Sequence, residues 1–212
     1  MEILSILSLL FGLCGLGGWL LIQWRVRHRS RQMITAFQDS ARGHLVLTQP
    51  LSGGGFAARL EPAPEPFAHF TITYRVRFHW GLFGWPTHAH PKDDRLVLQG
   101  TLPTRPAQEL QWVRGQIPAR ALGKAPDQVL WLLHRLDFVQ SEYVTRGTNP
   151  GSVQHSFSDL QRRFEPLLYQ ITILAENDPH VVVALQGQKL NIDQIASLMG
   201  LVRSIGRAAL LH

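Results

Sequence analysis

Histidines and carboxylates gather in a short segment around residue 90. His88 and His90 are separated by one residue, and Asp93 and Asp94 follow within four positions. Two imidazoles at this spacing can both reach a zinc ion from an extended strand, and a carboxylate can complete the ligand set. A short His-x-His motif in a proline-bounded loop is weak evidence for such a site. We therefore keep His88, His90 and Asp93 as the metal ligands of an alternative function, a metal-dependent hydrolase.

Other common catalytic patterns are missing from the sequence. There is no Gly-x-Ser-x-Gly motif, and the glycines at 53–55 are not followed by the lysine and hydroxyl residue of a phosphate-binding loop. Cys14 is the only cysteine and lies in an apolar stretch, so we expect no thiol catalysis, no internal disulfide and no cysteine zinc site. The sequence therefore favours a protein without enzymatic activity and without a cofactor.

Residues 3–22 form a continuous stretch without a charged side chain, which as a helix is long enough to cross the roughly 30 Å hydrocarbon core of a bilayer. A cleaved signal peptide carries its positive charge before the apolar run, whereas here four arginines follow it. Trp19 and Trp24 lie where interfacial tryptophans occur in membrane helices. We therefore predict an uncleaved, single-pass transmembrane anchor over residues 1–24.

The arginines Arg25, Arg27, Arg29 and Arg31 predict the orientation of this anchor, because basic flanks of a span are retained on the cytoplasmic side. The N-terminus is then outside the cell membrane and the C-terminal domain is cytoplasmic. The whole chain has a formal charge of +6, but residues 32–212 carry only +3. The excess therefore indicates contact with anionic lipid headgroups, worth about 1 kcal/mol per basic residue, rather than binding of nucleic acid.

Small residues recur within the apolar stretch. Gly12, Gly15 and Gly18 follow one another at intervals of three and fall near one side of a helix. A smooth glycine face lets another transmembrane helix approach closely. Glycines are also frequent in membrane spans in general, so a packing face for a neighbouring helix is a hypothesis.

A half-buried strand is predicted over residues 67–80, where apolar and polar side chains alternate. Its basic residues share the polar face, and the loop that follows contains more aromatic bulk than a solvated loop requires. This loop either folds into the core or inserts into a bilayer interface or a partner protein, for which tryptophan and arginine are well suited. The predicted partner interface comprises Arg75, Arg77, Trp80, Phe83 and Trp85.

The remaining periodicities predict strands at 45–48, 95–102, 110–115, 169–176 and 180–185, the last two forming a hairpin. Residues 50–66 predict a loop or a short strand, and 127–138 fit either a helix or a buried strand. Helices are predicted at 156–168, with Ser158 as N-cap, and at 192–211, with Asn191 as N-cap. In the last helix one apolar stripe comprises Ile195, Leu198, Met199, Val202 and Ile205.

These elements predict an α+β protein: a single N-terminal transmembrane helix followed by a cytoplasmic domain of antiparallel strands with a C-terminal hairpin and helices. The expected regions are a transmembrane anchor (1–24), a basic juxtamembrane amphipathic helix (25–43), a mainly β region (44–122) and an α+β region (123–212). With 45% hydrophobic and 17% charged residues, the chain is neither collagen-like nor wholly disordered.

The function expected from these features is that of a non-catalytic, membrane-anchored accessory or assembly subunit. Its cytoplasmic domain would bind partner proteins of a membrane complex. The expected partners are the bilayer and either another membrane protein or further copies of this chain. Besides the hydrolase, the sequence leaves open a tether or sensor for anionic lipid.

The glycine hypothesis predicts the effect of one substitution. Gly15→Leu adds a bulky side chain to the proposed packing face and is expected to lower the recovery of any membrane partner that co-purifies with the tagged protein. Quantitative mass spectrometry of the purified complex measures this recovery. A Leu13→Ile variant is the control, and equal recovery from both variants would remove the hypothesis.

Overall fold

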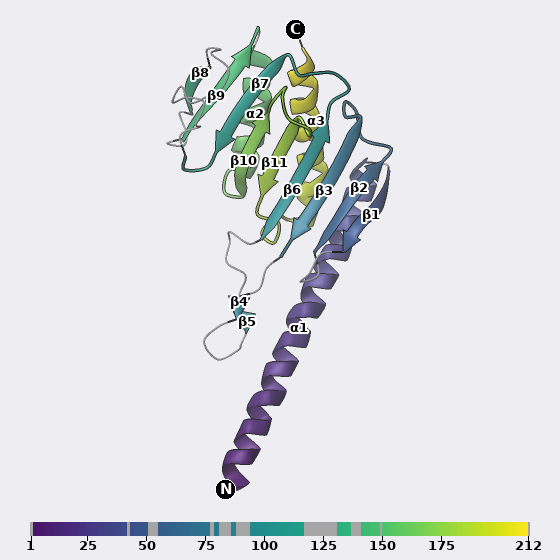
Figure 1. The fold of residues 1–212 in the computed structure, drawn as a ribbon, viewed down its shortest axis with the longest axis vertical. Helices are drawn as coiled ribbons and strands as arrows, with labels where there is room; N and C mark the ends of the chain where they lie inside the picture. Colours follow the sequence, from purple (N-terminus) through teal and green to yellow (C-terminus); the bar gives the residue numbers. More distant parts are fainter. Residues whose placement is uncertain are drawn as a thin grey trace.

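The computed structural model describes residues 2–41, 43–50, 55–76, 79–80, 86–87, 94–116, 131–136, 141–148 and 150–211. In this part of the chain one large antiparallel sheet is combined with three α-helices (Figure 1). The α+β class and the antiparallel strands expected from the sequence are therefore confirmed.

Nine of the described strands form the sheet, and all neighbouring strands run antiparallel. Their spatial order is β1 (His44–Pro50), β2 (Phe56–Glu61), β3 (His69–Arg75), β6 (Arg95–Thr101), β11 (Val181–Leu185), β10 (Leu168–Ile173), β7 (Gln108–Val113), β9 (Ser141–Gly147) and β8 (Leu132–Leu136). Because the C-terminal hairpin β10–β11 lies between β6 and β7, early and late parts of the chain share one sheet. Two further short strands, β4 (His79–Trp80) and β5 (Pro86–Thr87), pair only with each other.

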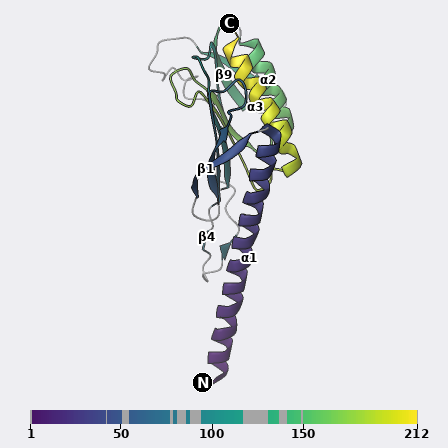
Figure 2. The same ribbon diagram turned by 90° about the vertical axis from the view of Figure 1, so that its right-hand side faces the viewer.

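The helices all lie on one face of the sheet, as Figure 2 shows in an edge-on view. They are α1 (Glu2–Ala41), α2 (Gly151–Phe164) and α3 (Ile195–Leu210), the last preceded by the 3₁₀ turn η3 (Ile192–Gln194). Helix α3 lies between the other two and contacts both of them. Only the C-terminal part of α1 reaches the domain, and the rest extends away from it (Figures 1 and 2).

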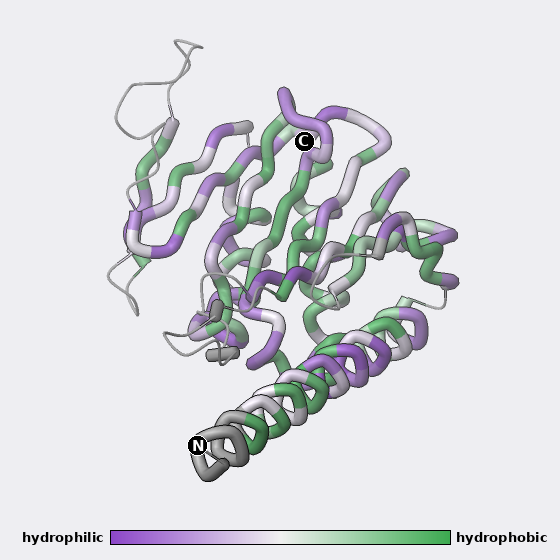
Figure 3. Tube along the Cα trace, turned by 60° about the horizontal axis from the view of Figure 1, so that its bottom comes forward, coloured by the Kyte–Doolittle hydropathy of each residue, from purple (hydrophilic) through white to green (hydrophobic). Residues whose placement is uncertain are grey.

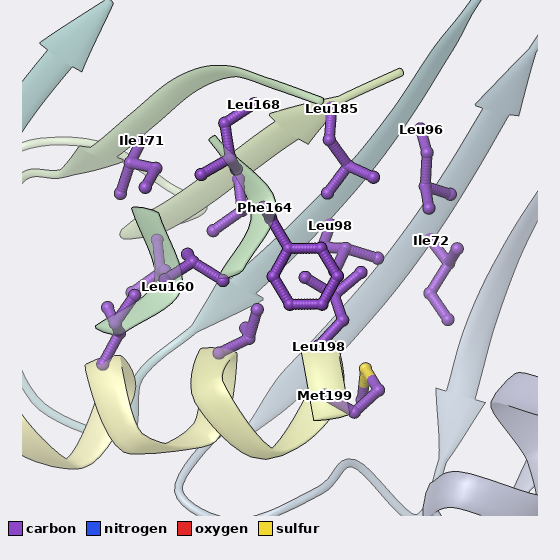
Figure 4. Close-up of a cluster of buried hydrophobic side chains, with 14 of the residues drawn as sticks. Ile72, Leu96, Leu98, Leu160, Phe164, Leu168, Ile171, Leu185, Leu198 and Met199 are labelled. Atoms are coloured by element: carbon purple, nitrogen blue, oxygen red, sulfur yellow. The ribbon is translucent and has the colours of Figure 1, made fainter. Parts of the chain in front are cut away.

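The core fills the space between the sheet and the helices. Along β3, Phe70, Ile72 and Tyr74 are buried while the residues between them are partly exposed, so one face of the strand points to the helices. Figure 4 shows how Phe164 at the end of α2 meets Leu198 and Met199 of α3 over the strands. The five residues of the stripe predicted in the last helix are all buried, which confirms that stripe.

The start of the last helical segment also follows the prediction. The side chain of Asn191 accepts a hydrogen bond from the Asp193 N–H, and the Gln194 side chain accepts one from the Asn191 N–H, forming a capping box. The expected N-cap of the preceding helix was wrong, because α2 begins at Gly151 and Ser158 lies in its interior. Pro150 precedes α2, and proline fixes a backbone dihedral compatible with a helix start.

The strands differ from the prediction in two places, and in a third place the structure decides between two open alternatives. The ladder of β3 ends at Arg75, because its partner β6 begins at Arg95 directly opposite. Residues 67–80 are therefore not one strand. Residues 79–80 form β4, which pairs with β5 instead. The ambiguous segment 127–138 contributes strand β8 where it is described. Strand β9 was not predicted. Its buried residues do not alternate, because Tyr143, Val144 and Thr145 are buried in succession.

The helix expected to cross a membrane has no direct support in the structure. Among the described residues, no helix combines the length and the apolarity that a membrane crossing requires.

The contrast between the two capping residues can be measured. Asn191→Ala removes a side-chain acceptor from the start of the helical segment and is expected to lower the free energy of unfolding by about 1 kcal/mol. Ser158→Ala replaces a residue inside α2 with a better helix former, and is expected to leave stability unchanged or raise it by a few tenths of a kcal/mol. Urea denaturation of both variants measures this, and a larger loss in Ser158→Ala would contradict the assignment.

Candidate functional site

The outer half of α1, which we define as residues 2–24, is the most unusual surface of the protein. Eight of its described large apolar side chains are exposed although they lie in one continuous helix. They comprise Leu9, Leu10, Leu13, Leu16, Trp19, Leu20, Leu21 and Trp24. Figure 3 shows the corresponding change from an apolar outer half to a mostly polar inner half. A contiguous apolar surface of this kind marks a contact with a membrane or another protein.

The inner half of α1, residues 25–41, attaches the helix to the domain. Val26, Ser30, Met33 and Phe37 are buried and follow one another at intervals of four, three and four residues, which places them on one side of the helix. This side contacts η3, α3, β1 and β2. Helix α1 is therefore one unbroken helix with a docked half and an outer half that extends away from the domain.

The four arginines predicted to contact lipid lie at the junction of the two halves. Arg25, Arg27 and Arg31 are exposed, whereas Arg29 is half-buried and its Nη2 donates a hydrogen bond to the carbonyl oxygen of Leu190. Three of the arginines thus face solvent beside the outer half, and the fourth connects α1 to the segment between β11 and η3.

The glycines predicted to pack against another helix are accessible. A Cβ atom built at Gly12, Gly15 or Gly18 would meet no atom of the chain within 4 Å. Nothing in the described structure therefore requires glycine at these three positions, and the side of the helix on which they lie is open.

We call the end of the sheet where β3 ends and β6 begins its base. A buried carboxyl, that of Asp94, lies there, where α1 meets the sheet. The Oδ2 atom of Asp94 accepts the backbone N–H of Gln188 at 2.6 Å, and its Oδ1 atom has no hydrogen-bond partner among the described residues. Burial raises the pKa of Asp94 from 3.8 to about 6, although the Gln188 hydrogen bond and the charges of Arg29 and Lys189 act in the opposite direction. Asp94 is 1% exposed, so this carboxylate is part of the interior.

Tyr74 lies beside this carboxyl at the end of β3. Its ring is fully buried against Phe56 at a centroid distance of 5.9 Å, and its hydroxyl has no hydrogen-bond partner among the described residues. Burial and the charge of Asp94 raise the pKa of the Tyr74 hydroxyl, so it remains protonated. A Cβ atom at Gly187 would approach the Tyr74 ring to 2.6 Å, which explains why glycine occupies that position.

Part of the predicted partner interface lies at the base or just beyond it. Arg75 is exposed at the end of β3, and Trp80 belongs to β4. Figures 1 and 2 both show the β4–β5 hairpin beyond the base, on the side toward which the outer half of α1 extends. Arg77, Phe83 and Trp85 lie outside the described residues.

The predicted metal ligands cannot be placed in the same way. His88, His90 and Asp93 all lie outside the described residues, so the hypothesis of a metal site remains untested. In the described part of the chain, no group of three or more histidine, cysteine, aspartate or glutamate side chains could hold a metal ion.

One histidine that the sequence analysis did not select has a hydroxyl neighbour. His134 Nε2 lies 2.8 Å from Thr145 Oγ1 and 3.0 Å from Gln154 Nε2, and burial lowers its pKa. Thr145 is fully buried, so a substrate could not reach its hydroxyl. This contact joins β8 to β9 and α2, and it serves packing rather than nucleophilic catalysis.

A buried ion pair was also not anticipated from the sequence. Glu109 on β7 is paired with Arg146 on β9, and it also accepts the backbone N–H of Ala175 at 2.7 Å. Arg146 in turn lies 4.8 Å from the centre of the Trp131 ring. The residues lie on different strands and are distant in sequence, so only the strand pairing brings them together.

Known proteins add no assignment. No protein-family model, curated protein or solved structure shows a significant match to the chain. The site is therefore interpreted from its own geometry: an exposed apolar helix, a cluster of basic side chains where it joins the domain, and a buried acid beneath them.

The buried acid predicts a pH dependence of stability. Because the pKa of Asp94 is higher in the folded than in the unfolded state, the folded state binds more protons between pH 4 and 6, and stability falls as the pH rises through this window. A shift of this size corresponds to at most about 3 kcal/mol. Asp94→Asn cannot ionise, so its stability relative to the wild type is expected to increase by about 1–3 kcal/mol from pH 4 to pH 7.

Urea denaturation of the full chain in detergent, at both pH values, measures this difference. Asp193→Asn is the matched control, because Asp193 is exposed in η3. An equal pH dependence in Asp94→Asn and the wild type would show that the Asp94 carboxyl does not titrate in this window.

Proposed function

We propose that this protein is a non-catalytic accessory or assembly subunit of a membrane complex, anchored by the outer half of α1. The observation that carries the proposal is that this half leaves the domain with its large apolar side chains exposed. No described part of the chain covers them. Leaving a single leucine side chain in water rather than burying it costs about 1.5–3 kcal/mol.

A bilayer suits this surface better than a groove on another soluble protein. The exposed leucines include both Leu9 and Leu10 and both Leu20 and Leu21, and adjacent helical residues point about 100° apart. The apolar surface is therefore not confined to one stripe, as it is in a helix that docks on a single partner. The uncharged stretch 3–22 also has the length of a membrane span. The described helices do not meet the requirements for a span, so the anchor is proposed from the sequence and from this exposure.

The proposed orientation follows from the exposed arginines. Arg25, Arg27 and Arg31 lie next to the outer half on the domain side. Basic residues in this position are retained in the cytoplasm. The domain would therefore be cytoplasmic, and the N-terminus would lie on the other side of the cell membrane.

A binding role is favoured over catalysis because the polar groups at the base lack the arrangement of an active site. Asp94 and the Tyr74 hydroxyl are buried, and Asp94 Oδ1 and the Tyr74 hydroxyl have no hydrogen-bond partner in the part of the chain that the structure describes. The described features that remain accessible are surfaces: the open glycine side of α1 and the exposed arginines Arg25, Arg27 and Arg31. Such surfaces serve contacts with a membrane, another helix or a partner protein.

Purification of the tagged protein from its native membranes in mild detergent, followed by native mass spectrometry, tests the proposal. A stoichiometric membrane-protein partner is the expected result. A lone protomer or a homo-oligomer carrying a metal would overturn it and favour the hydrolase. In that case His88→Ala and His90→Ala would release the metal, whereas an accessory subunit would retain its partner in both variants.

The anchor itself can be tested by charge. Leu13→Arg together with Leu16→Arg places two charges in the outer half, each costing about 3 kcal/mol at the centre of a span. The variant is expected to move from the membrane fraction to the alkaline extract. Leu132→Arg with Leu133→Arg is the matched control, because these leucines of β8 are similarly exposed, at 49% and 52%. Equal extraction of the two variants would show that the outer half is not a membrane anchor.

A further inference from the structure

Basic side chains of five segments converge at the base of the domain. Strand pairing places Arg75 at the end of β3 directly opposite Arg95 at the start of β6. Arg114 follows the end of β7, which lies at the same end of the sheet, and Lys189 follows β11. The inner half of α1 adds Arg29. We call these five residues the basic rim: Arg29, Arg75, Arg95, Arg114 and Lys189.

Hydrogen bonds bring the rim residues together. The N–H of Gln188, next to Lys189, donates to Asp94 at 2.6 Å, and Arg29 donates to the Leu190 carbonyl. The Arg114 N–H donates to the Tyr169 carbonyl at 2.9 Å.

Arg29 and Lys189 both lower the pKa of Asp94 against the larger effect of its burial. Arg95 and Arg114 both lower the pKa of Tyr169, whereas burial and the charge of Asp94 raise it. Four of the five cations therefore lie around one pair of titratable groups, and Arg75 is joined to them through the strand register.

The acidic groups that the structure describes at the base are fewer than the cations of the rim. Glu165 forms an ion pair with Arg114 at 2.8 Å, and Asp193 is exposed in η3. Asp94 lies beneath the surface and is protonated more readily than an exposed aspartate. Among the described residues, the five cations of the rim thus lie beside Glu165, Asp193 and the buried Asp94, while Glu142 at the same end of the sheet is paired with Arg135 at 3.6 Å.

The pairing of Arg75 with Arg95 is itself informative. Like charges directly opposite each other on neighbouring strands destabilise a sheet. Both side chains are exposed at the end of their strands, where an anion could approach them together. An anionic surface facing the base would attract both side chains at once.

The geometry of α1 points to the identity of that surface. The apolar exposed part of the helix ends at Trp24, and Arg29 already contacts the domain. Five residues of helix correspond to about 7.5 Å, which is within the screening length of about 8 Å at physiological ionic strength. If residues 3–22 cross a bilayer, its headgroups therefore lie within electrostatic reach of the base.

We propose that the basic rim binds the anionic phospholipid headgroups of the bilayer in which α1 is anchored. This inference rests on the proposed function, because it takes the outer half of α1 as the anchor. The rim is a second contact with the membrane, made by the folded domain rather than by the helix. Since α1 is unbroken between its two halves, a contact at the base sets the tilt of the whole domain over the membrane.

The test uses the full chain reconstituted into nanodiscs of phosphatidylcholine, with or without about one third phosphatidylglycerol. A Cys14→Ser, Gln188→Cys background carries one donor dye at the base, where the Gln188 side chain is exposed. Energy transfer to an acceptor on the lipid headgroups reports the approach of the base to the membrane. We expect higher transfer with the anionic lipid, and a loss of this increase at high salt.

Matched variants identify the residues responsible. Arg75→Gln with Arg95→Gln is expected to lose at least about half of the increase, and Arg75→Lys with Arg95→Lys, which keeps the charge, is expected to retain it. Arg105→Gln with Arg207→Gln removes the same charge from exposed positions outside the base and is expected to retain it as well.

Three outcomes would overturn the inference. Equal transfer in both lipid mixtures, or equal loss in the rim and control variants, would show that the rim does not contact the headgroups. If a single-stranded RNA abolishes the energy transfer equally in both lipid mixtures, the rim binds nucleic acid instead. Failure of the chain to co-purify with nanodiscs at all would instead refute the anchor, so the two proposals fail in distinguishable ways.

Discussion

The packing of the inner half of α1 on the helical layer is the contact on which the rest of the architecture depends. It buries Met33 and Phe37 completely and brings Arg29 to the Leu190 carbonyl. Because a helix is stiff over this length, the direction in which the inner half docks also determines where the outer half extends. The same contact places Arg29 near Asp94 at the base, while Arg25, Arg27 and Arg31 stay exposed beside the outer half.

The buried carboxyl of Asp94 opposes folding where α1 meets the sheet. Asp94 retains one hydrogen bond from the backbone and loses the solvation of its other oxygen, so its charged form is disfavoured. The nearby Arg29 and Lys189 reduce that penalty without removing it. The contact between α1 and the sheet is therefore held mainly by apolar packing. The ionised Asp94 opposes rather than assists folding at neutral pH.

The sequence predicted those elements whose signals are local. The stripe of the last helix, the Asn191 cap and the hairpin β10–β11 depend on residues close to one another in the chain, and all three were confirmed. Strand β9 was missed because it is covered on both faces, and period-two alternation disappears in such a strand. The end of β3 could not be located because it depends on where its partner β6 begins.

The features of the candidate site can also be separated into those with a local sequence signal and those without one. The exposed apolar helix and the flanking arginines are visible as composition, whereas the approach of Arg75 to Arg95 and of Asp94 to Tyr169 arises only from strand pairing. Neither the burial of Asp94 nor the ion pair of Glu109 and Arg146 has a local signal, because in each case the partners are far apart in sequence. The histidine motif was a local pattern as well, and its residues lie outside the described structure.

The absence of a break in α1 has a thermodynamic consequence for any partner. A domain on a flexible linker samples many orientations, and a partner that binds it must remove that freedom at the cost of rotational entropy. A domain fixed to one end of a continuous helix has already lost most of this freedom when the other end is held. With the proposed anchor, encounters with another membrane protein are confined to two dimensions and to a narrow range of approach angles. The outermost described strands of the sheet, β1 and β8, would then meet neighbours side-on, in the plane of the membrane.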